Sequence, residues 1–356
     1  MLNMRKTIMT LVMGAFLYPV TLSAQTGDNS PELQQIISSA GKFLSQNDFD
    51  NAAAMYTQAI RMAPENVALR RDLAYTYFLK KDFDRAKQTI EPVLNSPAAD
   101  EQTYQLASAI EQANGNISKA KKIVASGLDK FPGSGLLYNA KGNLQIADAK
   151  SNSSALKEWN TGIQKEPAYP TNYYNAAKAY FQNGEYMWAL IYAETFINLE
   201  PYTAKTVDMK RLLLDGYKKV FSQMSDNTLP EFNSSKSAEQ QRLDFTGAFK
   251  QSINSNISTI SDGFDVENLT MLRTRFLIYW NGHFAQRYPQ SLFTYQTRLV
   301  KNGHFNAYNQ WLFGAVENSQ NFTAWATQFK DAIRNFELWK QNNPYLPDVA
   351  DAHPTK

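Results

Sequence analysis

Five segments of the chain repeat one pattern at an interval of 34 residues, and this repeat constrains the fold more than any other feature. Within a segment, a small residue is followed three positions later by an aromatic one, then by an alanine, and a proline precedes the next segment. The segments begin near Leu33, Val67, Glu101, Gly135 and Pro170, and the fourth is one residue longer than the others. A repeat of this length is typical of helical pairs that stack into a solenoid.

The pattern is most complete in the first, second and fifth segments. These contain Ala40, Phe43, Ala52, Tyr56, Ala59 and Pro64, then Ala74, Tyr77, Ala86, Ile90, Val93 and Pro97, and then Ala177, Tyr180, Ala189, Ala193, Phe196 and Pro201. Small side chains allow two antiparallel helices to cross at about 8 Å, the lower end of the usual packing range. Glu111 and Gln145 replace the expected aromatic residue in the third and fourth segments, which are weaker.

Turn-forming residues divide each segment into two helices. We expect tight turns within pairs at Asn47-Asp48, Lys81-Asp82, Asn114-Gly115 and Asn183-Gly184. Prolines that cannot continue a helix are expected to end the second helix of each pair, at Pro64, Pro97, Pro132, Pro167 and Pro201. The fold class predicted for this part of the chain is therefore all-α.

This combination of period, small residues and prolines resembles the tetratricopeptide repeat. The resemblance implies a surface that binds a protein or peptide partner and performs no chemistry of its own. In that family the second, fifth, ninth, twelfth and thirteenth positions of the unit face the groove. Carried over, they include Arg71, Tyr75, Phe78, Leu79, Gln105, Asn139, Asn143, Tyr174, Lys178 and Phe181. Amide and aromatic side chains of this kind suit an extended peptide or a helix.

Two alternatives accompany the groove interpretation. Tyr75 and Phe78 could instead pack against neighbouring helices, or the groove could hold the chain's own second domain. One subgroup of the family binds a peptide's terminal carboxylate through a fixed set of Lys, Asn and Arg residues. Here Arg71, Asn143 and Lys178 lie in separate repeats and do not make up that set.

The first 24 residues have the features of a secretory signal peptide. Arg5 and Lys6 precede a mostly apolar run from Ile8 to Leu22, which is short for a membrane span, and cleavage is expected before Gln25. The rival interpretation is an uncleaved anchor. Because the chain contains no cysteine, disulfides and a lipid-modified cysteine are both excluded. We therefore expect a periplasmic protein that is not a lipoprotein and has no membrane span after cleavage.

The remaining chain divides into two helical parts. We expect the repeats in residues 25–203, a capping helix in 204–224, a linker in 225–235, a second aromatic-rich helical domain in 236–346 and a frayed polar tail in 347–356. Three apolar stripes at helical spacing support the second domain. They consist of Leu269, Leu272, Phe276, Tyr279 and Trp280, of Phe305, Tyr308, Trp311, Leu312 and Ala315, and of Trp325, Phe329, Ile333, Phe336 and Trp339.

Other functions have weaker support. Without the signal the chain has 34 basic and 33 acidic residues, a balance that does not favour nucleic acid as a partner. Asn-Gly-His-Phe occurs at Asn281–Phe284 and Asn302–Phe305, but no further ligands accompany His283 and His304. We expect Asn-Gly in each copy to end or bend a helix, and His-Phe to start the next turn. No catalytic motif, cofactor or metal site is predicted. A scaffold or adaptor for envelope assembly or secretion is preferred. The alternative is a glycan or small-ligand binding protein that uses the aromatic second domain.

Overall fold

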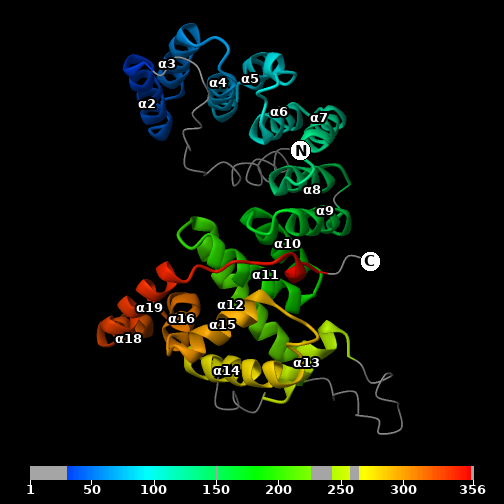
Figure 1. Cartoon of the computed structure of the whole chain (residues 1–356), viewed down its shortest axis with the longest axis vertical. Coiled ribbons are helices and arrows are strands. Elements are labelled where there is room, and N and C mark those ends of the chain that lie inside the picture. The colour runs from blue at the N-terminus through cyan, green and yellow to red at the C-terminus, as the bar shows by residue number, and fades with distance from the viewer. Residues whose placement is uncertain (1–29, 150, 226–242, 257–263, 354–356) are drawn as a thin grey trace. The chain divides into compact units, whose positions relative to one another are not determined.

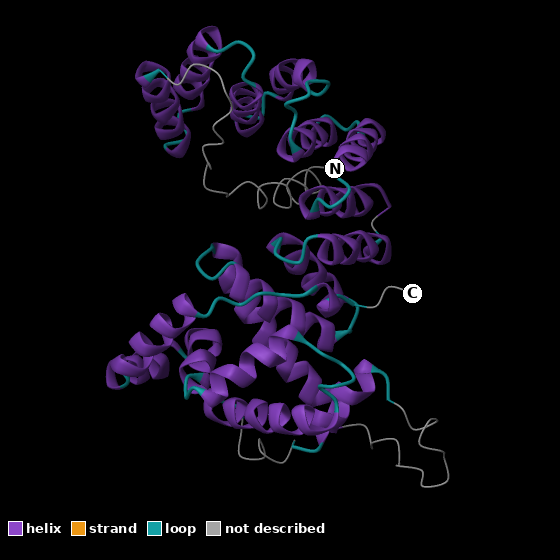
Figure 2. Ribbon diagram, in the orientation of Figure 1, coloured by secondary structure: helices purple, strands orange, loops and turns teal. Residues whose placement is uncertain are grey.

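The computed structural model describes residues 30–149, 151–225, 243–256 and 264–353, and their ordered elements are all helical (Figure 2). The contacts divide the chain into two units, Met1–Lys165 and Glu166–Lys356, which are treated separately below. The all-α prediction is confirmed. The predicted signal peptide (1–24), residues 226–235 of the linker and residues 354–356 of the tail lie outside the described residues.

The described residues of unit 1 form four helical pairs that follow one another in order (Figure 1). The pairs are α2 (Pro31–Ser45) with α3 (Phe49–Met62), α4 (Val67–Leu79) with α5 (Phe83–Ile90) and the 3-10 turn η1 (Glu91–Val93), α6 (Glu101–Ala113) with α7 (Ile117–Lys130), and α8 (Gly135–Ala149) with α9 (Asn152–Lys165). The helices α4, α6 and α8 begin at the residues predicted from the repeat.

The helix boundaries in unit 1 follow from side-chain capping and from the turn residues. The side chains of Asp48, Asp82 and Asp100 each accept a hydrogen bond from the backbone N–H three residues later, which satisfies a donor that the first turn leaves free. Asn47 and Lys81 occupy the turns with positive φ of 59° and 66°. The predicted turns at these positions are confirmed.

Close helix crossings form the core of unit 1. Ala40, Ala52 and Ala74 have no exposed surface. In the fourth pair, Gly142 occupies the corresponding position, and Trp159 of α9 lies directly against its backbone. A Cβ atom built on Gly142 would be 2.3 Å from Trp159 Nε1, so only glycine fits at this crossing.

Glu111 is buried where the repeat pattern predicts an aromatic residue, and it is paired with two cations. Lys119 Nζ lies 2.9 Å and Lys87 Nζ 3.3 Å from its Oε1 atom, and Asn116 donates to Oε2 at 2.8 Å. Burial alone would raise the pKa of Glu111, but the hydrogen bonds from Lys119, Asn116 and Lys87 lower it. An ion pair therefore takes the place of aromatic packing in this repeat.

Unit 2 contains the fifth pair and the helices that follow it. Its elements are α10 (Pro170–Gln182), α11 (Tyr186–Leu199), α12 (Ala204–Ser225), α13 (Phe245–Asn254), α14 (Val266–His283), α15 (Ser291–Lys301), α16 (Phe305–Asn309), the π-helical turn η3 (Gln310–Gly314), α17 (Ala315–Glu317), α18 (Ser319–Gln328), α19 (Lys330–Asn342) and the 3-10 turn η4 (Val349–Asp351). Gly184, at φ +79°, forms the predicted turn between α10 and α11. Helix α12 packs along α11.

This division by contacts separates the fifth pair from the first four, whereas the repeat register groups all five. The contacts reflect packing, whereas the register reflects the period of the sequence. The predicted boundary near residue 203 therefore stays a prediction. Apolar side chains of α11, α14, α15 and α16 make up much of the core of unit 2, and Trp280, Tyr308 and Phe313 are among its largest fully buried residues.

The expected frayed tail is wrong for residues 347–353. Residues 343–353, called here the C-terminal strap, run across α10 and α11 (Figure 1). The backbone N–H of His353 donates to the Tyr192 hydroxyl at 2.7 Å, and the Tyr345 hydroxyl lies 3.4 Å from Thr195 Oγ1. The His353 ring stacks on Tyr180. Tyr345 and Asp351 are buried, so the strap belongs to the core of unit 2.

Two sequence patterns also differ from their predicted structures. The third apolar stripe is divided at Phe329, where α18 ends and α19 begins, and the second is interrupted by the π-helical turn. At the first Asn-Gly-His-Phe motif, α14 ends at His283 and a turn follows from Phe284, although Gly282 itself stays within the helix. At the second, Gly303 has φ +73° and Phe305 starts α16, as predicted.

Candidate functional site

The predicted groove positions of unit 1 lie on α4, α6 and α8. Arg71 forms ion pairs with Asp72, at 3.5 Å, and with Asp100. Phe78 is buried in the core, where its ring lies 5.6 Å from that of Phe83, and Tyr75 packs against the same cluster. These contacts agree with the alternative in which Tyr75 and Phe78 pack against neighbouring helices.

The polar groove positions of unit 1 are also largely covered. Gln105 and Asn139 are buried, and Asn143 of α8 is half-buried and donates to Asn139 Oδ1 at 3.2 Å. These contacts define where the side chains lie. The groove of unit 1 accordingly stays a prediction.

The groove positions of unit 2 form a basic and aromatic surface on α10. The half-buried Tyr174 ring packs against Phe196 at 5.2 Å between ring centroids. Lys178 Nζ lies 5.1 Å and Lys205 Nζ 5.3 Å from the Tyr174 ring centroid, both within the range of a cation–π interaction. Phe181, two turns beyond Tyr174 on α10, packs against Tyr186 at 5.3 Å. We call Tyr174, Lys178 and Lys205 the α10 basic surface.

Lys205 was not among the predicted groove residues because it belongs to α12, which lies beyond the last repeat. The repeat register contains no signal for it. Burial lowers the pKa of the Lys205 ammonium, and the charge of Glu200 acts in the opposite direction. Lys178, by contrast, is exposed. Two ammonium groups beside one aromatic ring can receive a carboxylate together with an adjacent apolar side chain.

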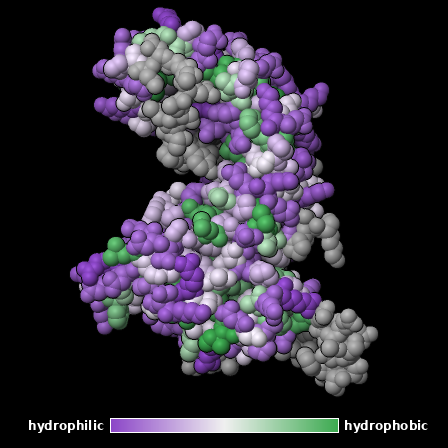
Figure 3. Space-filling model, in the orientation of Figure 1, coloured by the Kyte–Doolittle hydropathy of each residue, from purple (hydrophilic) through white to green (hydrophobic). Residues whose placement is uncertain are grey.

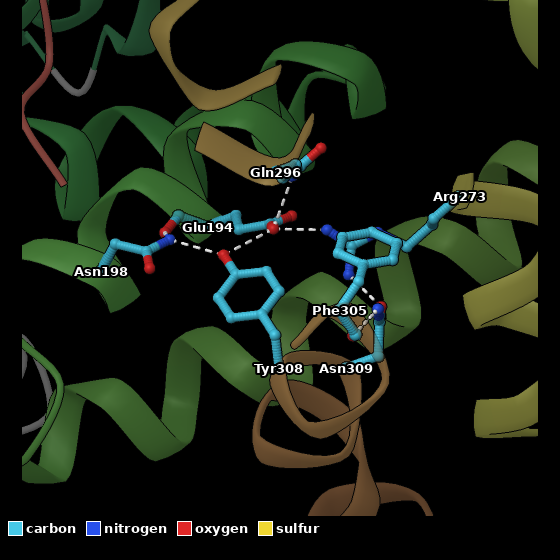
Figure 4. Close-up of polar contacts among 7 residues, drawn as sticks. All are labelled: Glu194, Asn198, Arg273, Gln296, Phe305, Tyr308 and Asn309. Atoms are coloured by element: carbon cyan, nitrogen blue, oxygen red, sulfur yellow. Dashed lines mark hydrogen bonds and ion pairs between the residues drawn. The ribbon is translucent and has the colours of Figure 1, made fainter. Parts of the chain in front are cut away.

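A second polar cluster of unit 2 is fully buried and centres on Glu194 of α11 (Figure 4). Its Oε1 atom accepts hydrogen bonds from Arg273 of α14, from Gln296 Nε2 of α15 at 2.7 Å and from the Tyr308 hydroxyl of α16 at 2.8 Å. Arg273 also donates to Asn309 Oδ1, and Asn198 donates to the Tyr308 hydroxyl at 2.7 Å. One carboxylate thus connects four helices.

The charges in this cluster stabilise one another. Burial would lower the pKa of the Arg273 guanidinium, but Glu194 holds it above its ordinary value. Burial, followed by the charge of Glu194, raises the pKa of Tyr308 well above its usual value, so this hydroxyl stays protonated. Glu194 is the only charged residue of α11. A single charge in a largely apolar helix is a signal that could have identified it.

A small cavity lies beside the Glu194 cluster and is lined by Glu194, Arg273 and Gln296 together with apolar side chains such as Leu190. Its volume of about 20 Å³ is enough for about one water molecule. A sugar ring does not fit there. The alternative of glycan binding therefore gains no support from this cavity.

The two histidines of the repeated motif have separate aromatic neighbours. His283 stacks on Tyr279 with ring centroids 4.1 Å apart, whereas His304 packs on Trp339 at 5.6 Å. The described part of the chain contains no group of three or more His, Cys, Asp or Glu side chains that could hold a metal ion. In the same residues, no helix has both the length and the apolar character needed to span a membrane.

Comparison with known proteins identifies the repeats. A family model described as the tetratricopeptide repeat matches residues 43–110, and it is a repeat family rather than a catalytic one. The comparison with curated proteins finds no match.

Three solved structures are similar to this chain at low identity. A thermophilic tetratricopeptide repeat protein of Thermus thermophilus is 15% identical, with 51% of this chain and 99% of the other covered and a TM-score of 0.44. A tetratricopeptide repeat protein of Parabacteroides merdae is 12% identical, with 74% and 97% covered and a TM-score of 0.38. PilW, a type IV pilus biogenesis factor, is 14% identical, with 56% and 94% covered and a TM-score of 0.43. From the matched sequence and the capped helical pairs, we conclude that residues 43–110 are tetratricopeptide repeats.

Proposed function

We propose that this chain is a non-catalytic scaffold whose repeat helices bind an extended segment of a partner protein. The partner segment carries a carboxylate next to an aromatic or apolar side chain. The observation that carries this proposal is the α10 basic surface, where Lys178 and Lys205 both lie against the half-buried ring of Tyr174. The match to a repeat family supports a binding role.

The chemistry of the α10 basic surface favours an acidic segment. A carboxylate placed near Lys178 and Lys205 is attracted by both positive charges. It would also stabilise the ammonium form of Lys205, which burial disfavours. The Tyr174 ring offers a rigid apolar contact for the neighbouring side chain of the partner. On the face drawn in Figure 3, hydrophobic surface occurs only in small separate areas, so this face offers no broad apolar interface.

A peptide-display selection against the purified chain tests this function. Because two lysines lie beside one aromatic ring, we expect the selected peptides to contain Asp or Glu within two residues of Phe, Tyr, Trp or Leu. In fluorescence anisotropy, the double variant Tyr174→Ala with Lys178→Ala is expected to bind a selected peptide at least tenfold more weakly than the wild type.

The matched control for this selection is Lys157→Ala, which removes an exposed lysine from α9. Its affinity for the selected peptide is expected to equal that of the wild type. Selected peptides without acidic residues, or equal affinities for all variants, would contradict the proposal. Tyr75→Ala is a suitable second probe of the groove, whereas Phe78→Ala is not, because Phe78 is part of the core.

We propose further that the scaffold works in the periplasm, in envelope assembly or secretion. The support for this setting is the pattern of Arg5, Lys6 and the following apolar run. When the full chain is produced in a bacterium with an outer membrane, the protein is expected in the osmotic-shock fraction with Gln25 as its N-terminal residue. A full-length chain retained in the cytoplasm would contradict this setting.

A further inference from the structure

A cavity separates the middle of the C-terminal strap from α15. Its volume is about 420 Å³, within the range of small-molecule binding sites. One wall is a face of α15 that includes Ser291, Thr294, Tyr295 and Arg298, and the opposite wall is formed by residues 344–351 of the strap. None of the predicted site residues belongs to this cavity.

The strap is fastened to α15 at both ends of the cavity. At one end, Asp351 accepts hydrogen bonds from the backbone N–H of Ser291 at 2.7 Å and from that of Asp348 at 2.8 Å. At the other end, Arg298 donates to Asn343 Oδ1 at 2.5 Å. Ser291 and Arg298 are seven residues apart on one helix, a distance of about 10 Å along its axis. The cavity therefore has a defined length.

Its two ends carry opposite charges. The Arg298 guanidinium lies over the Trp339 ring at 5.6 Å from the centroid, and none of the described acidic side chains is within salt-bridge distance of it. At the other end are the carboxylates of Asp348, which is exposed, and Asp351, which is buried. A ligand with only one sign of charge would meet a like charge at one end, whereas a zwitterion is complementary to both.

The wall of the cavity also contains a polar group that lacks a partner. The Tyr295 hydroxyl is buried and accepts or donates no hydrogen bond within the described residues. Burial raises the pKa of this hydroxyl to about 12, and the charge of Arg298 acts in the opposite direction, which indicates that the two groups lie near each other. Unsatisfied buried polar groups are uncommon in folded proteins and are often associated with a ligand, ion or water.

We propose that this cavity binds a short zwitterionic peptide of two or three residues. The terminal carboxylate is held by Arg298 and the terminal ammonium by Asp348 at the opposite end, with Asp351 fixing the position of Asp348. An extended chain spans about 3.3–3.6 Å per residue, so two or three residues match the length between the charged ends. This site is separate from the α10 basic surface, so either proposal can fail without the other.

Isothermal titration calorimetry with the full chain tests the proposal directly. The probes are dialanine, trialanine, N-acetyl-dialanine and dialanine amide. At least one of the two free peptides is expected to bind. Removal of either terminal charge is expected to weaken binding at least tenfold. This loss is measured with the two blocked dialanines and with the corresponding trialanine derivatives. No binding of either free peptide at millimolar concentration, or equal binding of free and blocked peptides, overturns the proposal.

Two variants assign the charges. Arg298→Gln is expected to remove the preference for the free carboxylate over the amide while leaving the preference for a free ammonium. Arg334→Gln, on the exposed face of α19, is the matched control and is expected to bind like the wild type. If Arg298→Gln fails to fold, the comparison of free and blocked peptides on the wild-type chain still decides the outcome. An Arg298→Gln variant that keeps full carboxylate selectivity overturns the assignment.

Discussion

Replacing Glu194 with alanine is expected to destabilise unit 2 by about 3–5 kcal/mol. The substitution leaves the buried guanidinium of Arg273 without its carboxylate, and it also removes the acceptor for Gln296 and Tyr308. A buried charge without a partner is costly because the surrounding protein cannot replace the water that was lost. Urea unfolding followed by tryptophan fluorescence measures the effect, since five of the six tryptophans belong to unit 2.

A double substitution separates the cost of the unpaired charge from the value of the pair itself. In Glu194→Ala with Arg273→Leu, no buried charge is left, so we expect this variant to be more stable than Glu194→Ala alone. Such a recovery is typical of buried ion pairs, whose attraction is largely offset by their desolvation. Glu194→Ala with wild-type stability, or a double variant less stable than the single one, would contradict this account of the cluster.

Replacing Gly142 with alanine is expected to destabilise unit 1 by about 1–3 kcal/mol. Two effects oppose each other here. In a helix, alanine is favoured over glycine by about 1 kcal/mol. The new Cβ atom, however, would lie 2.3 Å from Trp159 Nε1, far closer than any real contact, so the indole ring or α9 has to move. The ring is also held by a hydrogen bond from Nε1 to the backbone carbonyl of Asn139 at 3.4 Å. We therefore expect the steric effect to dominate.

A control and a coupled substitution test this explanation for Gly142. Gly41, inside α2, has nothing within 4 Å of a built Cβ atom, so Gly41→Ala is expected to stabilise the protein slightly. Trp159→Leu removes the ring that Gly142→Ala would displace, so the double variant is expected to lose less stability than the sum of the two single variants. Hydrogen-exchange mass spectrometry on peptides from α8 and α9 measures these effects locally. Strict additivity would show that the ring does not cause the loss.

The helical pairs of the repeats were predictable because their determinants are local. The starts of α5 and α6 depend on the residues that cap them, Asp82 and Asp100, and on turn residues between helices, such as Lys81. Each of these contacts spans three or four residues, and the 34-residue period repeats them. The sequence left open whether Phe78 is buried and could not indicate the burial of Gln105 and Asn139, because burial depends on the packing of neighbouring helices.

Unit 2 was less predictable because its determinants lie far apart in the chain. The Glu194 cluster joins residues 79 to 114 positions apart, and no local pattern links them. The strap shows the same difficulty. Residues 347–353 are mostly polar or small, which predicts a frayed tail, yet Asp351 is buried because it accepts hydrogen bonds from the backbone of Ser291 and Asp348. The lysines of the α10 basic surface come from two helices, and the repeat register includes only one of them.

The position of the strap also determines when unit 2 can finish folding. The strap contacts residues 150 and 161 positions earlier in the chain, at Thr195 and Tyr192. During synthesis the helical pairs of unit 1 can form as soon as each pair is complete, because their contacts are local. The core around α11, by contrast, stays incomplete until residue 353 has been made. The two units thus differ in the timing of their maturation, because unit 2 cannot complete its core before the strap has been synthesised.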